Sequence, residues 1–390
     1  MQIEYDGGIL ITMTIDSGHK ENLNHHDTTK SQSHKVKRKN WLDRRSREFQ
    51  NKKKRNKKPD QQPHNLVDES AKREENIPRS EMPIVFSISK DYNKSVICFN
   101  EVKNMEQVIK HNGVVELDFT QVLDFDVESL IYLLAIIDKI KEKKRCEVRI
   151  LPPKDINIID RFCQTGFTEM AQAKDWINTQ TDGSWNNNIG EKLFKITRGH
   201  GVDSSLVNGV KTYSIVYLGL SHEKVRPIYD ILIELMSNKV AHSNSQYWYL
   251  YTERDVDNKK RMKYVFFDTG SGIPNTVRKR FHENVLRMFG GIKKATDASL
   301  IKSVLEGHYR PRTDEDFRGQ GLPQVAKNLN ADYISKGAIN SGRGRCEIRL
   351  KQSGETVYLT HNFARRFFGT LFCWEMSSTN VGRFYHDNEC

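Results

Sequence analysis

Three short stretches decide the fold, and they read ELMSN at residues 234–238, DTGSGIP at residues 268–274 and GQGL at residues 319–322. The first is expected on a helix over residues 222–243, where apolar side chains recur every three or four positions. Glu234 and Asn238 are four residues apart and therefore share one face of that helix. A carboxylate can orient or deprotonate a water, and an amide oxygen is a hard ligand that suits Mg²⁺. The alternative is two solvated polar residues on a helix surface.

The second stretch follows a short β-prone run at residues 264–267. At the end of that run, the carboxylate of Asp268 can accept a hydrogen bond from the amino group of a flat base. Gly270 and Gly272 let the backbone approach the base without a Cβ in the way. The glycines of the third stretch open a helix, whose free N–H groups suit a phosphate. Each piece alone also fits an ordinary turn or loop, but together they predict a pocket for ATP and Mg²⁺.

In order, element type and residue identity, the three stretches resemble the GHKL superfamily, which includes gyrase, the ninety-kilodalton heat-shock chaperone, histidine kinases and the MutL repair protein. The resemblance covers about residues 205–377. It implies a Bergerat fold, a two-layer α/β sandwich, in which residues 369–374 (GTLFCW) belong to the last strand. The expected fold class of the chain is therefore α/β, or α+β.

The resemblance also implies a role for each position. Glu234 would be the general base for ATP hydrolysis or would assist phosphoryl transfer, Asn238 would bind Mg²⁺, and Asp268 would hold the adenine amino group. Residues 275–318 would form a mobile lid whose lysines and arginines can reach a phosphate. The other residues expected to bind the nucleotide are Gly270, Gly272, Ile273, Arg318, Gly319, Gly321 and Leu322.

Positive charge is concentrated near the N-terminus. The net charge is +12, and residues 35–58 carry thirteen lysines and arginines against Asp43 and Glu48. Residues 1–82 contain few large apolar side chains, so we expect a mostly disordered arm. Such an arm can bind nucleic acid or an acidic partner, or it can be a solvated tail. It lacks the apolar core and the small-residue cleavage site of a signal peptide.

Residues 83–170 have the alternating strand and helix pattern of a second, small α/β unit. The order resembles the STAS domain of anti-sigma-factor antagonists, and an unrelated α/β domain is the alternative. Those antagonists carry a phosphorylatable serine directly after an aspartate at a helix start, whereas Val127 follows Asp126 here and Ser129 comes later. We therefore expect a docking or dimerisation scaffold rather than a phospho-switch. Strands are expected at residues 84–89, 96–100, 114–119 and 147–151, and helices at 126–141 and 155–163.

The expected division of the chain is an arm (1–82), the STAS-like unit (83–170), a connector (171–204), the nucleotide-binding domain (205–380) and a tail (381–390). No window reaches the roughly 18 to 20 apolar residues of a membrane span. The six cysteines form no CxxC pair and no metal spacing. Buried, reduced thiols and the missing export signal fit the cytoplasm.

These features favour an intracellular, Mg²⁺-dependent, ATP-binding regulator that hydrolyses ATP or transfers its phosphate to a serine of a protein partner. The partner would dock on the STAS-like unit, and a homodimer is a further expectation. The alternative is a nucleic-acid-associated ATPase anchored by residues 35–58. It is disfavoured because the positive charge lies in the arm rather than on a folded face, and because no transducer-type domain follows Trp374. A sensor histidine kinase is disfavoured because no helical hairpin with a phosphoacceptor histidine precedes the pocket. ATP binding without turnover is left open.

Overall fold

The computed structural model describes the chain from residue 77 to residue 378 with seven internal gaps. All described residues belong to one compact unit, Ser70–Cys390. They form an α/β fold with parallel and antiparallel sheets. The basic segment 35–58 lies outside the described residues. None of the described helices is long and apolar enough to cross a membrane. The described ranges are 77–173, 195–242, 247–254, 261–290, 294–308, 321–329, 333–350 and 356–378.

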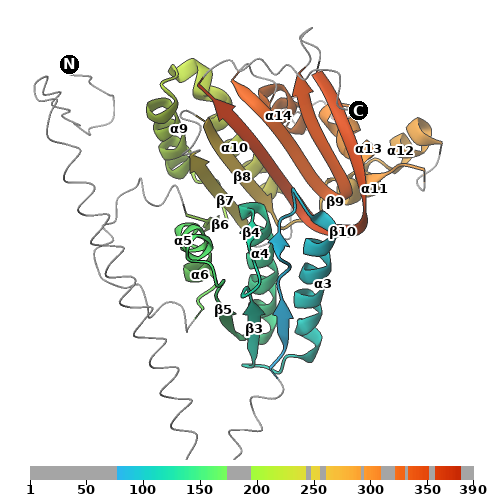
Figure 1. Cartoon of the computed structure of the whole chain (residues 1–390). Helices are drawn as coiled ribbons and strands as arrows, with labels where there is room; N and C mark the ends of the chain where they lie inside the picture. Colours follow the sequence, from blue (N-terminus) through green and yellow to red (C-terminus); the bar gives the residue numbers. More distant parts are fainter. Residues whose placement is uncertain are drawn as a thin grey trace, which may run out of the picture. The chain divides into compact units, whose positions relative to one another are not determined.

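The upstream part contains two parallel sheets. Strands β1, β3 and β5 form a three-stranded sheet in that order, and β2 pairs with β4. Helices α3 and α4 pack against each other beside these strands (Figure 1). The elements are β1 (Arg79–Glu81), β2 (Val85–Phe86), α3 (Tyr92–Val108), β3 (Val114–Asp118), β4 (Asp124–Phe125), α4 (Val127–Lys144), β5 (Glu147–Leu151), α5 (Ile156–Gln164) and α6 (Phe167–Met170).

One expected strand of this part is wrong. Residues 96–100 lie inside helix α3 rather than in a strand. The helix begins because the side chain of Asp91 accepts a hydrogen bond from the backbone N–H of Lys94 at 3.2 Å. Val96, Phe99 and Val102 are buried at a three-residue spacing, which is the spacing of one helix face. The short apolar run therefore fits either element, and the flanking cap decides for the helix.

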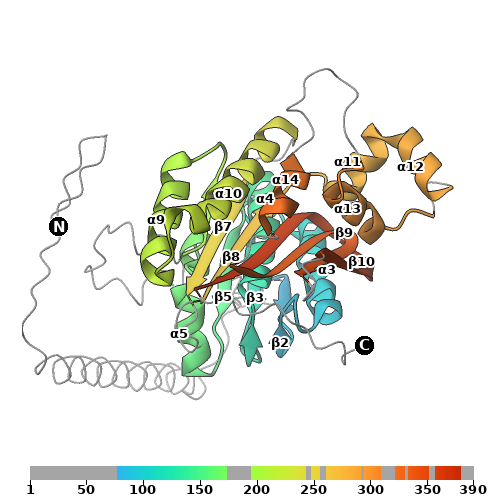
Figure 2. The same cartoon turned by 90° about the horizontal axis from the view of Figure 1, so that it is seen from above.

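The downstream part is built on a five-stranded antiparallel sheet with the order β6-β7-β8-β10-β9. Its first helices, α9 and α10, lie side by side, and α14 packs on α10 (Figures 1 and 2). Helices α11, α12 and α13 lie at the opposite end of the sheet from α9 (Figure 2). The elements are β6 (Thr197–Gly199), α9 (Ser204–Leu218), α10 (His222–His242), β7 (Trp248–Arg254), β8 (Arg261–Asp268), α11 (Ile273–Arg280), α12 (His282–Phe289), α13 (Asp297–Leu305), α14 (Gly321–Leu329), β9 (Ile334–Leu350) and β10 (Thr356–Ser377).

Both faces of the central strands are buried, each in a different core cluster. Tyr264 and Phe266 of β8 pack with the helices α9, α10, α13 and α14. Val265 and Phe267 point to the other face and join the core of the upstream part, to which α3 and α4 contribute. A strand buried on both sides reads as a continuous apolar run, which explains the sequence of β8. The upstream part and one face of the downstream sheet therefore share one of the two core clusters.

The described cysteines are free thiols, as expected. Cys98, Cys146 and Cys346 are buried, and Cys163 and Cys373 are partly buried. Burial raises the pKa of the Cys98 and Cys346 thiols to about 12, so both remain protonated at neutral pH.

Candidate functional site

Glu234 and Asn238 lie on a helix, as predicted. Helix α10 spans His222–His242, and the amide nitrogen of Asn238 donates a hydrogen bond to Oε1 of Glu234 at 2.8 Å. Both side chains are half-buried. Because the amide nitrogen is used in this bond, the amide oxygen is the atom of Asn238 that is left to coordinate a cation. The opposite side of the helix, with Leu235 and Met236, is fully packed against the sheet.

The carboxylate of Glu234 has an altered protonation equilibrium. Burial raises its pKa above the ordinary value, although the hydrogen bond from Asn238 acts in the opposite direction. A half-buried carboxylate with a raised pKa is a better proton acceptor than an exposed one. The pair can therefore orient a water and accept a proton from it.

The predicted adenine-side loop begins where β8 ends, at Asp268. The carboxylate of Asp268 accepts a hydrogen bond from the backbone N–H of Gly270 at 3.0 Å, which fixes the turn. Gly272 has φ +81° and caps α11, whose first residue is the buried Ile273. A Cβ at Gly272 would lie 2.8 Å from Oγ of Ser341. Only glycine fits this position, both for its backbone angle and for the space.

A buried serine on β9 connects this loop to the sheet. Oγ of Ser341 accepts a hydrogen bond from the backbone N–H of Ile273 at 3.0 Å and donates one to the carbonyl oxygen of Gly369 at 2.8 Å. The hydroxyl of Thr370 lies 3.0 Å from Oγ of Ser341, and Thr370 is the strand partner of Asp268. Neither Ser341 nor the role of Thr370 was predicted. Sequence spacing contains no signal for contacts between positions about seventy and one hundred residues apart.

The third stretch is described only in part. Gly321 is the first residue of α14, and Leu322 is half-buried against the helix-side core. Arg318 and Gly319 lie outside the described residues. Helix α14 packs along α10, the helix that carries Glu234.

The described parts of the three stretches lie on the helix side of the five-stranded sheet. Residues from all of them contribute to one hydrophobic cluster: Leu235 and Met236 from α10, Ile273 from the loop after β8, and Leu322 at its edge. This confirms their expected placement on a helix, after a strand and at a helix start. The polar residues of α10, the glycine loop and the start of α14 therefore belong to one layer of the fold.

Part of the expected lid belongs to the core. Helix α13 buries Leu300 and Ile301 fully. At its start, the carboxylate of Asp297 forms an ion pair with Arg278 at 2.6 Å and accepts the backbone N–H of Arg343 at 2.6 Å. Helices α11 and α13 are thus joined to each other and to β9 by these contacts. Residues 309–320, which include the C-terminal end of the expected lid, lie outside the described residues.

The serine at the start of α4 is enclosed. Ser129 is fully buried, and its hydroxyl donates to Oδ1 of Asp126 at 2.6 Å and accepts the backbone N–H of Ile88 at 2.8 Å. Oδ2 of Asp126 accepts the hydroxyls of Ser87 and Ser89. This network caps α4 and ties it to the loop after β2.

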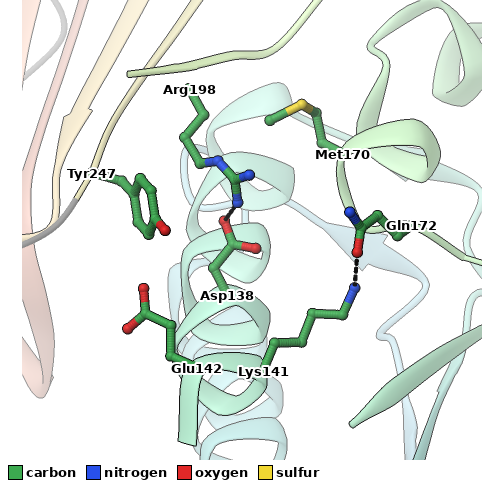
Figure 3. A pocket seen from close by; sticks show the side chains of 7 residues that line it. All are labelled: Asp138, Lys141, Glu142, Met170, Gln172, Arg198 and Tyr247. Atoms are coloured by element: carbon green, nitrogen blue, oxygen red, sulfur yellow. Dashed lines mark hydrogen bonds and ion pairs between the residues drawn. The ribbon is translucent and has the colours of Figure 1, made fainter. Parts of the chain in front are cut away.

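A polar pocket of about 240 Å³ is lined by residues of α4 and of neighbouring segments (Figure 3). Its central group is Asp138 of α4, which accepts hydrogen bonds from Arg198 at 2.8 Å and from the hydroxyl of Tyr249 at 2.6 Å. Lys141 donates to the side chain of Gln172 at 3.1 Å. These groups form hydrogen bonds with one another, so the pocket lies at the contact between α4 and strands β6 and β7. None of the residues predicted to bind ATP lines it. The described residues contain no group of three metal-binding His, Cys, Asp or Glu side chains.

A comparison with known protein families finds none that matches this chain, and a comparison with curated proteins finds no similar one. The geometry of the site therefore has to carry the functional argument.

Proposed function

We propose that the chain binds ATP with Mg²⁺ at the site formed by α10, the loop after β8 and the start of α14, and that it hydrolyses ATP. The observation that carries the proposal is the hydrogen-bonded pair Glu234–Asn238 on the same sheet face as the glycine loop after Asp268. The resemblance to GHKL proteins in these three stretches agrees with this arrangement.

The residues present fit the nucleotide. Asp268 offers a carboxylate at the end of a strand. Gly272, which has a positive φ, adds no side chain to the loop beside it. An adenine amino group can donate to that carboxylate. Ser341, Gly369 and Thr370 are fully or almost fully enclosed and hold the loop in a single geometry. Such pre-organisation reduces the entropy cost of binding.

The residues of α10 fit Mg²⁺ and the attacking water. Magnesium takes few protein ligands and keeps several waters, so one amide oxygen from Asn238 is sufficient beside the phosphates. When bound, the ion neutralises charge on the phosphates. Glu234 then orients the water and takes its proton, which the raised pKa of this carboxylate favours.

The hydrolysed nucleotide would serve as a switch for a protein partner in the cytoplasm. The apolar face of α4 is not available for docking, because α4 is buried within the chain against α3, α6 and β8. A partner would therefore use the outer surfaces of the upstream part. Transfer of the phosphate to a serine of that partner is the alternative to hydrolysis.

Phosphate release from ATP tests this proposal. The wild-type chain should release phosphate with Mg²⁺, and Glu234→Gln should slow release about 100-fold or more, because it removes the general base. Glu223→Gln changes an exposed carboxylate in the first turn of the same helix and should have no effect. Equal rates for the two variants would refute the role of Glu234. Unchanged ATP binding with no release in any protein would favour sensing or phosphotransfer.

A further inference from the structure

The hairpin formed by β9 and β10 extends beyond the rest of its sheet. Strand β8 pairs with β10 only from Thr370 to Ser377. Residues 356–362 of β10 pair with β9 alone, as a two-stranded ribbon. On one of its faces Cys346 and Ile348 enter the helix-side core. The other face lies on the side of the sheet that packs against the upstream part. That contact ends at Tyr92, whose ring stacks on the ring of Phe363 with the two centroids 3.4 Å apart.

The uncovered part of the hairpin is cationic. Between residues 341 and 368 the described part contains five arginines and a single acidic residue, Glu347. Arg345 and Arg349 both form ion pairs with Glu347, at 2.9 and 2.8 Å, which leaves a net positive triad. The arginines are Arg343, Arg345, Arg349, Arg365 and Arg366, and we call them the hairpin arginines.

Three of the hairpin arginines are exposed: Arg343, Arg365 and Arg366. Exposed His361 lies opposite Arg345 in the ladder. In the register of β10, residues 363–366 lie within the shift between Asn362 and Phe367, so they leave the regular alternation. Phe363, the one aromatic residue among these four, stacks on Tyr92 of α3. Arg365 and Arg366 remain at the surface, where Arg366 donates a hydrogen bond to the side chain of Asn275.

We infer that the hairpin arginines form a surface for the phosphate backbone of a nucleic acid. A guanidinium presents a planar fork of donors that matches a phosphate, and the five hairpin arginines outnumber the single described acidic residue of the hairpin, Glu347. A two-stranded ribbon has the dimensions to follow a groove of a duplex. Because the chain outside residues 35–58 is close to neutral, this cluster is a local segregation of charge and not a general excess.

A long polyanion suits the chain better than a compact acidic protein. An extended polyanion can place successive phosphates against the exposed Arg343, Arg365 and Arg366, and each such contact releases counterions. The nearby stacked pair Tyr92–Phe363 is already occupied, so the surface should read no bases and bind without sequence preference.

The test measures binding of the full chain to a labelled mixed-sequence DNA duplex and to an RNA of the same length, without nucleotide. The key variant is Arg365→Gln/Arg366→Gln, and the matched control is Lys143→Gln/Arg226→Gln, which removes two exposed charges from α4 and α10. The hairpin variant should lose about tenfold in affinity near 0.1 M salt, and its salt slope should fall by about two, since each phosphate contact contributes about 0.9. The control should change affinity less than about twofold.

Equal losses in both double variants would show that only total charge matters and would overturn the inference, as would an unchanged affinity of the hairpin variant. The contribution of residues 35–58 is present in every protein and cancels in the comparison. An unchanged rate of ATP turnover in the hairpin variant separates this outcome from a failure of the proposed ATP site.

Discussion

Lys263 of β8 donates a hydrogen bond to the carboxylate of Glu128 of α4 at 2.8 Å, and only 24 and 7% of the two side chains are exposed. The thiol of Cys373 on β10 also donates to Glu128, at 3.2 Å. This buried ion pair joins the upstream helix to the strand that ends at Asp268. Burial alone would lower the pKa of Lys263, but the neighbouring Glu128 carboxylate keeps it well above its ordinary value. Lys263 is therefore charged, and its bond to Glu128 connects the upstream helix α4 to β8.

Removal of one partner of this pair should be costly. Glu128→Gln leaves the Lys263 ammonium buried without its carboxylate, so the free energy of unfolding should fall by about 3 kcal/mol. Urea unfolding of the full chain measures this loss. Glu106→Gln breaks a surface pair with Lys143 and should cost less than about 1 kcal/mol. If the double variant Glu128→Gln/Lys263→Met is not more stable than Glu128→Gln, the loss does not come from the unpaired charge.

The cap of α4 should make stability depend on acid pH. Burial would raise the pKa of Asp126, but hydrogen bonds from Ser129, Ser87 and Ser89 outweigh it and lower the pKa below its ordinary value of 3.8. A depressed pKa contributes stability that is fully present above the unfolded value and is lost as the pH falls through the folded value. Asp126→Asn should therefore cost about 2 kcal/mol at pH 7, and the difference from wild type should shrink below pH 3.8.

Unfolding curves at neutral and acid pH measure this difference. Asp91→Asn is the matched control, because Asp91 caps α3 at the surface with one backbone hydrogen bond. Its cost should be about 0.5 kcal/mol. A difference for Asp126→Asn that is the same at both pH values would contradict the argument from its carboxylate.

Gly272 should not tolerate a side chain. Gly272→Ala adds a Cβ 2.8 Å from Oγ of Ser341 and forces a positive φ on alanine. We expect a loss of about 2 kcal/mol in unfolding free energy and weaker ATP binding. Gly219 separates the two costs, because it has φ +63° and nothing within 4 Å of its Cβ position. Gly219→Ala should cost about 1 kcal/mol through the backbone alone and should leave ATP affinity unchanged. Equal effects of both variants on ATP affinity would argue against a specific role for the loop.

The sequence predicted those elements that depend on local pattern. The helix with Glu234, the strand before Asp268 and the buried helix α4 follow from periodicity, and the structure confirms them. Residues 96–100 were wrongly expected as a strand, since five residues are too few to separate a period of two from a helical one. The fold class is α/β, as expected.

Contacts between distant residues could not be predicted. Ser341 holds the loop at Ile273 from β9, and nothing in the local sequence of either residue indicates the other. The shared core was missed for the same reason, because the continuous apolar run of residues 264–267 indicates that both faces of β8 are buried but not what covers them. The hairpin arginines are scattered over about twenty-five residues and are brought together only by the pairing of β9 with β10.

Equilibrium binding of ATP tests the central proposal most directly. Titration of the full chain with ATP and Mg²⁺ should give saturable, one-site binding, and Asp268→Asn should weaken it about tenfold or more by replacing the acceptor of the adenine amino group. Asp155→Asn, at the start of α5, is the control and should bind as the wild type does. Absence of ATP binding in the wild-type chain, or equal affinities of the wild type and Asp268→Asn, would contradict the account.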